Sequence, residues 1–308
     1  MTRLADALER ANARRSDAAA DSGSIAMATG PTMAPALTLV TPEAEPRVAM
    51  GASLITMPTR HDGPTGWRTD PELIGKLVGS DGFGHAALEQ YRKLAATLHH
   101  AQVERGMKVI MTTSALPSEG KSLTAVNTAL TLSDSYQRRV LLVDADLRRP
   151  TIQRIFGLPA NSGLIEGLRS EKEYSMTPVQ MTERLYVLPA GRPDPDPISA
   201  LTSLRMKRVL AHAGSLFDWV VVDTPPLGLL PDASLLADFV DGVLLVVRCG
   251  KAPFSLVKRT VDGVSRDKII GVIMNAVDLA HDRNAGGYYE YYGSGYYGTP
   301  AGKQAGKK

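Results

Sequence analysis

The stretch SALPSEGKS, residues 114–122, places Gly120, Lys121 and Ser122 between an apolar run and a helix-like run. A phosphate-binding loop needs this order. Backbone N–H groups meet the anion at a helix N-terminus, the lysine reaches the β- and γ-phosphates, and the hydroxyl ligates magnesium. The match to G-x-x-x-x-G-K-[ST] is imperfect, since Ala115 stands where the first glycine belongs. A GKS tripeptide also occurs in surface turns, but its place between a strand and a helix favours a nucleotide-binding loop.

Aspartates end two other apolar runs. The stretch LLVDADLRRP carries Asp144 and Asp146, and the stretch WVVVDTPP carries Asp223. In an open parallel sheet, ligands bind at the carboxyl ends of the strands. Two such carboxylates can hold magnesium, directly or through water, and the remaining one can orient a nucleophile. A single aspartate after a strand is usually a cap or turn residue. The prediction of a nucleotide site therefore depends on all three stretches occurring in this order.

Tyrosines gather near the end of the chain, in GGYYEYYGSGYYG, residues 286–298. The interleaved glycines keep this segment pliable, so that single phenols could enter an active site. The alternative interpretation is a sticky, low-complexity aromatic tail. The candidate acceptors of phosphate are Tyr288, Tyr289, Tyr291, Tyr292, Tyr296 and Tyr297.

Strands and helices alternate along the middle of the chain. The strands are too apolar to face water, and the predicted fold is α/β, a mainly parallel central sheet with helices on both faces. The predicted strands span 107–113, 139–144, 184–190, 218–223, 241–248 and 269–275. The predicted helices span 121–136, 162–170, 199–213, 231–239 and 254–265, and an amphipathic helix near 87–98 comes before the first strand.

The ends of the chain differ from its middle in composition. Residues 1–81 predict a largely disordered arm rich in Ala and Pro, residues 82–278 a folded domain, and residues 279–308 a flexible tail rich in Gly and Tyr. No apolar window reaches the roughly 18 to 20 residues of a membrane-spanning helix. The net charge of +3 is too small to argue for nucleic acid. The one cysteine, Cys249, suits a reducing cytoplasm.

Taken together, SALPSEGKS, LLVDADLRRP and WVVVDTPP resemble the bacterial tyrosine kinases of the capsular and exopolysaccharide type, a branch of the P-loop NTPases. The resemblance runs from about Leu88 to the tyrosine cluster. The loop of that family reads Ser-x-x-Pro-Gly-Glu-Gly-Lys-Ser or Thr, so Ala115 is expected there and Ser118 replaces the usual glycine. The resemblance implies a kinase that uses ATP and Mg²⁺ and phosphorylates its own tail.

The resemblance also assigns roles to residues. Lys121 with Asp144 and Asp146 would be catalytic, and either aspartate could position the phenol. Asn275 resembles the residue that meets the adenine edge in related ATPases, although a turn residue ending the last strand is an equal reading. The implied nucleotide-binding residues are Ser118, Glu119, Gly120, Lys121, Ser122, Leu123 and Asn275, and the implied metal ligands are Ser122, Asp144 and Asp223.

Partners follow from the same resemblance. A membrane-embedded chain-length or activator protein would bind the kinase through its cytoplasmic segment, and would hold it peripherally at the inner face of the membrane. The family assembles rings through Glu-x-x-Arg-x-x-Arg. This chain supplies Glu89 and Arg92 but has Ala95 in the third place, so a homo-oligomer is expected and its size is open.

Two other functions share the motifs. A partition- or septum-positioning ATPase would carry a lysine near the start of the loop, where this chain has Ala115 and Leu116. A scaffold that binds nucleotide without transferring phosphate would not need Lys121 and the three aspartates.

Overall fold

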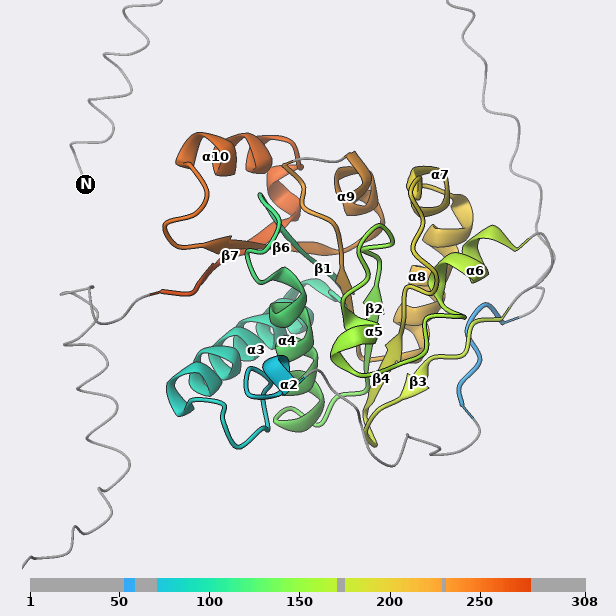
Figure 1. The fold of residues 1–308 in the computed structure, drawn as a ribbon, viewed down its shortest axis with the longest axis horizontal. Helices are drawn as coiled ribbons and strands as arrows, with labels where there is room; N and C mark the ends of the chain where they lie inside the picture. The colour runs from blue at the N-terminus through green and yellow to red at the C-terminus, as the bar shows by residue number, and fades with distance from the viewer. Residues whose placement is uncertain (1–52, 59–70, 171–174, 229–230, 278–308) are drawn as a thin grey trace, which may run out of the picture. The chain divides into compact units, whose positions relative to one another are not determined.

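A computed structural model describes residues 53–58, 71–170, 175–228 and 231–277. Its centre is a seven-stranded sheet of order β3-β4-β2-β5-β1-β6-β7 (Figure 1). All neighbouring pairs are parallel except β3 and β4, which are antiparallel. The strands are β1 (Val109–Ser114), β2 (Val140–Asp144), β3 (Val179–Gln180), β4 (Leu185–Leu188), β5 (Trp219–Asp223), β6 (Gly242–Arg248) and β7 (Ile269–Asn275).

Helices cover both faces of the sheet, as predicted. Buried side chains of α3, α4 and α5 pack with one face, and those of α6, α7 and α8 pack with the other. Alternate residues of a strand serve opposite faces, so Ile110 joins the first core and Met111 the second. The helices are α2 (Pro71–Ile74), α3 (His85–Arg105), α4 (Lys121–Asp134), α5 (Ile152–Ile155), α6 (Leu164–Arg169), α7 (Ile198–Leu201), α8 (Leu204–Leu216), α9 (Pro231–Leu236) and α10 (Phe254–Asp262), with 3₁₀ turns η2 (Ala237–Phe239) and η3 (Arg266–Lys268).

Three elements differ from the prediction. The helix expected at 199–213 is two helices, because Ser203 leaves the helical conformation and its hydroxyl accepts the N–H of Met206 as an N-cap. Helix α5 and strand β3 are present but were not predicted. Both span only about one period, four residues for α5 and two for β3, which is too short to show a repeating hydrophobic pattern.

Two segments of the predicted arm, 53–58 and 71–81, are among the described residues. Ile55 is 1% exposed and lies in the core beside α6 and α8. The N–H of Thr56 donates to the carbonyl of Met176 at 3.0 Å, and the N–H of Met176 donates to that of Leu54 at 2.9 Å. The folded part therefore includes residues before position 82. The rest of the arm and the tail, with its six tyrosines, lie outside the described residues.

Membrane crossing would require a long apolar helix. None of the helices in the described ranges has the length and hydropathy for it.

Candidate active site

The loop between β1 and α4 has the shape of an anion cradle. Gly120 precedes α4 with φ of +94°, a left-handed conformation that favours glycine. A Cβ at Gly120 would lie 2.0 Å from Nδ2 of Asn275, so no larger residue fits without movement. Ser118 also has a positive φ, of 60°. Close packing and a left-handed backbone thus fix the turn that enters a 14-residue helix, and a helix N-terminus favours an anion.

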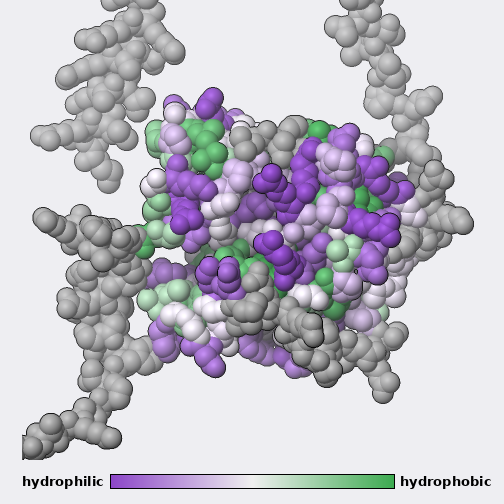
Figure 2. Space-filling model, in the orientation of Figure 1, coloured by the Kyte–Doolittle hydropathy of each residue, from purple (hydrophilic) through white to green (hydrophobic). Residues whose placement is uncertain are grey.

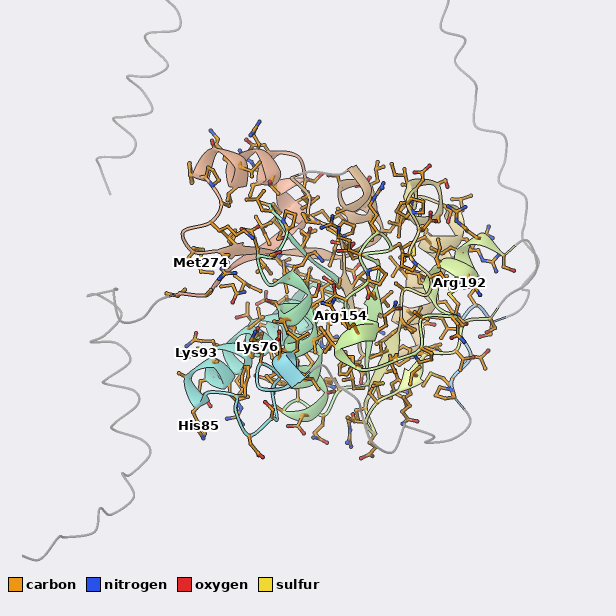
Figure 3. The ribbon with its side chains drawn as sticks, viewed as in Figure 1. Lys76, His85, Lys93, Arg154, Arg192 and Met274 are labelled. Atoms are coloured by element: carbon orange, nitrogen blue, oxygen red, sulfur yellow. The ribbon has the colours of Figure 1, made fainter. Side chains whose placement is uncertain are left out.

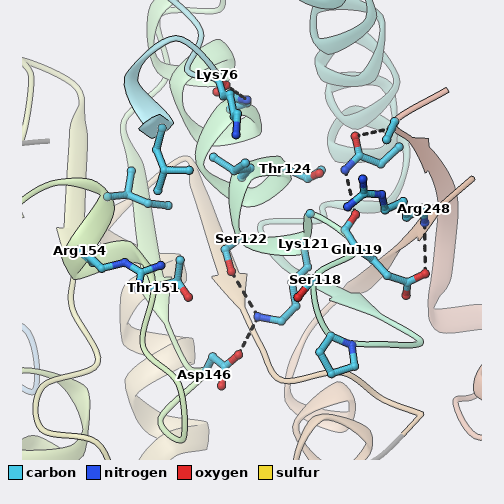
Figure 4. Close-up of a pocket in the computed structure, with 18 of the residues that line it drawn as sticks. Lys76, Ser118, Glu119, Lys121, Ser122, Thr124, Asp146, Thr151, Arg154 and Arg248 are labelled. Carbon is cyan, nitrogen blue, oxygen red and sulfur yellow. Dashed lines mark hydrogen bonds and ion pairs between the residues drawn. The ribbon is translucent and has the colours of Figure 1, made fainter. Parts of the chain in front are cut away.

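The side chains of Glu119 and Asn275 hold this loop through hydrogen bonds. Glu119 is fully buried, and its carboxylate accepts the N–H of Leu116 at 2.7 Å. It also accepts the N–H of Arg248 at 3.2 Å (Figure 4). Asn275 donates through Nδ2 to the carbonyl of Glu119 at 2.8 Å, and its Oδ1 accepts the N–H of Ala276. Glu119 therefore supports the site with its side chain. The amide of Asn275 holds the loop, and its contact with adenine stays a prediction.

Lys121 lies at the centre of a buried cluster of charges. Its Nζ is 2.7 Å from Oδ2 of Asp146, 3.6 Å from Oδ1 of Asp223 and 3.2 Å from Oγ of Ser122. Burial by itself lowers the pKa of Lys121, but the negative charges of Asp223 and Asp146 outweigh it and raise that pKa. The lysine is therefore a permanent cation at the start of α4.

Asp144 lies behind this cluster and is fully buried. Its carboxylate accepts backbone N–H groups of Asp146 at 3.2 Å, Thr151 at 3.1 Å and Ile152 at 2.9 Å. Burial, and then repulsion from Asp223, raise its pKa to about 8. Asp144 thus fixes the turn that carries Asp146, and it does not line the cavity.

Asp223 is the carboxylate best suited to a cation. It is fully buried, and neither oxygen has a hydrogen bond of good geometry among the described residues, although the Ser122 hydroxyl and Nζ of Lys121, 3.6 Å from Oδ1, both stabilise its charge. Burial raises its pKa, because the charged form lacks solvation. Magnesium is commonly held by one or two carboxylates together with water and substrate phosphates. Asp223 and the hydroxyl of Ser122 fit that pattern, although the described ranges hold no group of three or more His, Cys, Asp or Glu side chains placed to bind one metal ion together.

A cavity of about 1050 Å³ opens in front of the loop. It is lined by every predicted nucleotide-binding residue and by Asp146, whereas Asp144 and Asp223 lie beneath its wall. Five basic residues of this lining have no predicted role. Arg148 and Arg149 come two and three residues after Asp146 in LLVDADLRRP, which was a usable signal, whereas Lys76 lies in the predicted arm and had none. These residues are Lys76, Arg148, Arg149, Arg154 and Arg248.

The expected ring motif lies on α3. Arg92 donates to Glu89 within the same helix at 2.7 Å. Ala95 is fully buried in the core, so this third position is not offered to a neighbouring subunit. The homo-oligomer stays a prediction.

The fold and the loop define a nucleotide-binding protein of the P-loop class. No family model matches the chain. The chain is 36% identical over 214 residues to the tyrosine-protein kinase YwqD of Bacillus subtilis (strain 168), covering 68% of this chain and 86% of YwqD. It therefore belongs to the bacterial tyrosine kinases, and this membership decides against the partition- or septum-type ATPase.

Two further proteins extend the comparison. The kinase domain of the Escherichia coli tyrosine kinase ETK superposes with a TM-score of 0.60 at 30% identity, covering 64% of this chain and 78% of that domain. The succinoglycan biosynthesis transport protein ExoP of Rhizobium meliloti (strain 1021) is 34% identical over 202 residues, covering 64% of this chain and 25% of ExoP. The likeness to ETK supports the predicted fold.

Proposed function

We propose that this tyrosine kinase uses ATP and Mg²⁺ to phosphorylate its own tyrosine cluster, and thereby regulates synthesis or export of an exopolysaccharide or capsule. The observation that carries the proposal is the buried cluster at the start of α4. It joins Lys121 to Asp146 at 2.7 Å beside Ser122 and Asp223. This arrangement offers a cation for phosphate, a carboxylate for a phenol and ligands for a metal at one point.

The residues divide the work of phosphoryl transfer. The amides of the loop and Lys121 bind the phosphates, and Ser122 with Asp223 would hold magnesium, which neutralises charge on the phosphate groups when bound. Asp146, 5% exposed in the cavity wall, orients the attacking phenol and accepts its proton. The phenol oxygen forms a bond to the γ-phosphorus as the bond to ADP breaks. A phenol has a pKa near 10, so alignment contributes more than prior deprotonation.

The family resemblance implies that Asp144 is a metal ligand, but in this scheme Asp144 has another role. Three backbone N–H groups already occupy its oxygens. We assign it to positioning Asp146 and the turn that follows.

The setting in the cell is the second part of the proposal. The relationship to ExoP, a succinoglycan biosynthesis transport protein, supports a role beside polysaccharide export. We propose that a membrane-embedded partner binds this kinase through its cytoplasmic segment and holds it at the inner face of the membrane. Purified chain should float with vesicles that contain the partner, and should remain unbound with vesicles that lack it.

The experiment for catalysis is mass spectrometry of the tail after incubation with ATP and Mg²⁺. Wild-type chain should carry phosphate on several of the six tyrosines, and Lys121→Met should carry none. Lys207→Met, which changes an exposed lysine of α8, is the matched control and should behave as wild type. Equal labelling of the Lys121→Met chain, or an unlabelled wild-type tail even with the activating segment supplied, would refute the proposal.

A further inference from the structure

The cavity continues beyond the phosphate loop into a region lined by positive charge. Lys76 follows α2, Arg149 follows Asp146, and Arg154 belongs to α5. We call these three residues the basic rim. Figure 4 shows Arg154 and Thr151 on the opposite side of Ser122 from Arg248. Figure 3 labels Lys76 and Arg154 in the middle of one face, where Figure 2 shows strongly hydrophilic residues.

The rim's charge is uncompensated within the described residues. The side chains of Lys76, Arg149 and Arg154 are exposed and form no ion pair there. Two carboxylates line the same cavity, and both are already engaged, Glu119 by backbone N–H groups and Asp146 by Lys121. Single exposed cations are ordinarily just solvated. Three that line one cavity without a matching anion indicate a negatively charged ligand.

The nucleotide does not account for the rim. The loop amides and Lys121 already supply donors for the phosphates at the start of α4. Arg248, Asn275 and Ala276 line the other side of the cavity, next to the loop. The basic rim instead lies on the side of α5 and α2. That side is left for the second substrate, the acceptor.

Aromatic side chains accompany the rim. Phe83 and Tyr91 line the cavity, and their ring centroids are 6.0 Å apart with planes inclined at 44°. Tilted rings at this separation are a favourable arrangement and give an apolar surface for a further ring. A bound acceptor tyrosine could pack its phenol on these rings while its chain neighbours lie near the cations. Such a site matches a tyrosine flanked by negative charge.

We propose that the basic rim selects acceptor tyrosines whose neighbour is a carboxylate or a phosphotyrosine. This inference rests on the proposed function. The tail offers both kinds of neighbour, because Glu290 lies between Tyr289 and Tyr291 and the six tyrosines occur as adjacent pairs. Each transfer adds about −1.5 to −2 charge beside a remaining acceptor. Phosphorylation of the cluster therefore promotes itself, starting beside Glu290.

Single-acceptor peptides of residues 286–293 test the preference with the full-length chain. All carry Tyr288→Phe, Tyr291→Phe and Tyr292→Phe, so that Tyr289 is the acceptor. One peptide keeps Glu290, one has Glu290→Gln, and one has Glu290→Gln with phosphotyrosine in place of the Phe at 288. Relative to the Gln peptide, we expect KM to fall about threefold with Glu and about tenfold with phosphotyrosine, since charge-assisted contacts carry this range of energies.

The rim variant Arg149→Gln with Arg154→Gln should reduce both preferences to about one, with the KM for ATP unchanged. Arg208→Gln, on the exposed side of α8 and outside the cavity, should keep them. Salt at 0.5 M should weaken the wild-type preference, because screening acts on exposed charges.

Four outcomes would overturn the inference. Equal KM for all peptides, or a preference that survives in the rim variant, shows that the rim does not select the acceptor. A tenfold rise in the KM for ATP in the rim variant assigns these arginines to the nucleotide instead. Failure to phosphorylate any peptide and the tail itself would remove the proposed function along with the inference.

Discussion

The positive charges at the two ends of the cavity have opposite surroundings. At the inner end, Lys121 is 8% exposed and lies against Asp146 and Asp223. At the basic rim, Arg149 and Arg154 are exposed and unpaired within the described residues. A buried cation needs partners, because its desolvation is costly. An exposed cation needs none and remains available to a ligand. We therefore expect the inner end to hold a fixed reaction geometry and the rim to serve recognition.

The difference predicts different kinetic effects. Changes at the inner end should reduce kcat, since the paired charges position the reacting groups. Changes at the rim should alter the KM for the acceptor by modest factors, because each exposed charge contributes little interaction energy.

Asp146→Asn gives the largest expected effect. The variant loses the carboxylate that orients the phenol and the ion pair to Lys121 at 2.7 Å. We expect kcat for the tail to fall by about 10²- to 10⁴-fold, the usual range for a group that moves a proton. Asp267→Asn, at an exposed turn, is the control and should leave kcat unchanged. If only the KM for the acceptor changed, Asp146 would contribute to acceptor binding, as the rim does, and the stated difference between the two ends of the cavity would be wrong.

Asp144→Asn should change the pH dependence of stability. The pKa of Asp144 is about 8 in the fold and near 4 in an unfolded chain. Between these values the folded state holds a proton that the unfolded state has released, so wild-type stability falls as the pH rises. The asparagine removes roughly 3 to 4 kcal/mol of that fall between pH 5 and pH 8.

Denaturant unfolding at pH 5 and pH 8 measures this effect. The variant should be less stable than wild type at pH 5, because both oxygens of the protonated acid can still accept N–H groups, whereas the NH₂ of the amide cannot accept any. It should then lose less stability than wild type on moving to pH 8. An identical loss in the two proteins would mean that Asp144 is not the titrating group.

Asn275→Ala should weaken the loop without touching any charge. The variant loses the hydrogen bond from Nδ2 to the carbonyl of Glu119. We expect the KM for ATP to rise about tenfold, which corresponds to one hydrogen bond of about 1.4 kcal/mol. Met274→Ala, one residue earlier and 55% exposed, is the control. If both variants bind ATP as wild type does, Asn275 does not brace the loop.

Ser118→Gly gives the smallest expected change. Ser118 is held at φ of 60°, where a residue with a Cβ is strained and glycine is not. Glycine also gains freedom in the unfolded chain, so the net gain in unfolding free energy should be below about 1 kcal/mol. Ser118→Ala should be neutral, since it retains the Cβ. A clear loss of stability in the glycine variant would show that the Ser118 side chain makes a necessary contact.

The sequence predicted the sheet well because its strands are continuous apolar runs, such as WVVVD at 219–223. It predicted the loop because Gly120, Lys121 and Ser122 are local in the chain. It missed α5, since four residues provide no periodic pattern. It also treated 53–58 as part of a disordered arm, because one isoleucine buried by a distant helix leaves no trace in local composition.

The sequence by itself determined the class of fold, the phosphate loop and the acidic strand ends, because each depends on neighbouring residues and on patterns of two or about four residues. Only the tertiary structure distinguished the surroundings of the three aspartates. Asp144, Asp146 and Asp223 read alike in the sequence. In the fold, Asp144 accepts backbone N–H groups and Asp146 pairs with Lys121. Asp223 has no hydrogen bond of good geometry in the described part of the chain. Partners distant in sequence set the solvation and neighbours of a charge, and these determine its chemistry.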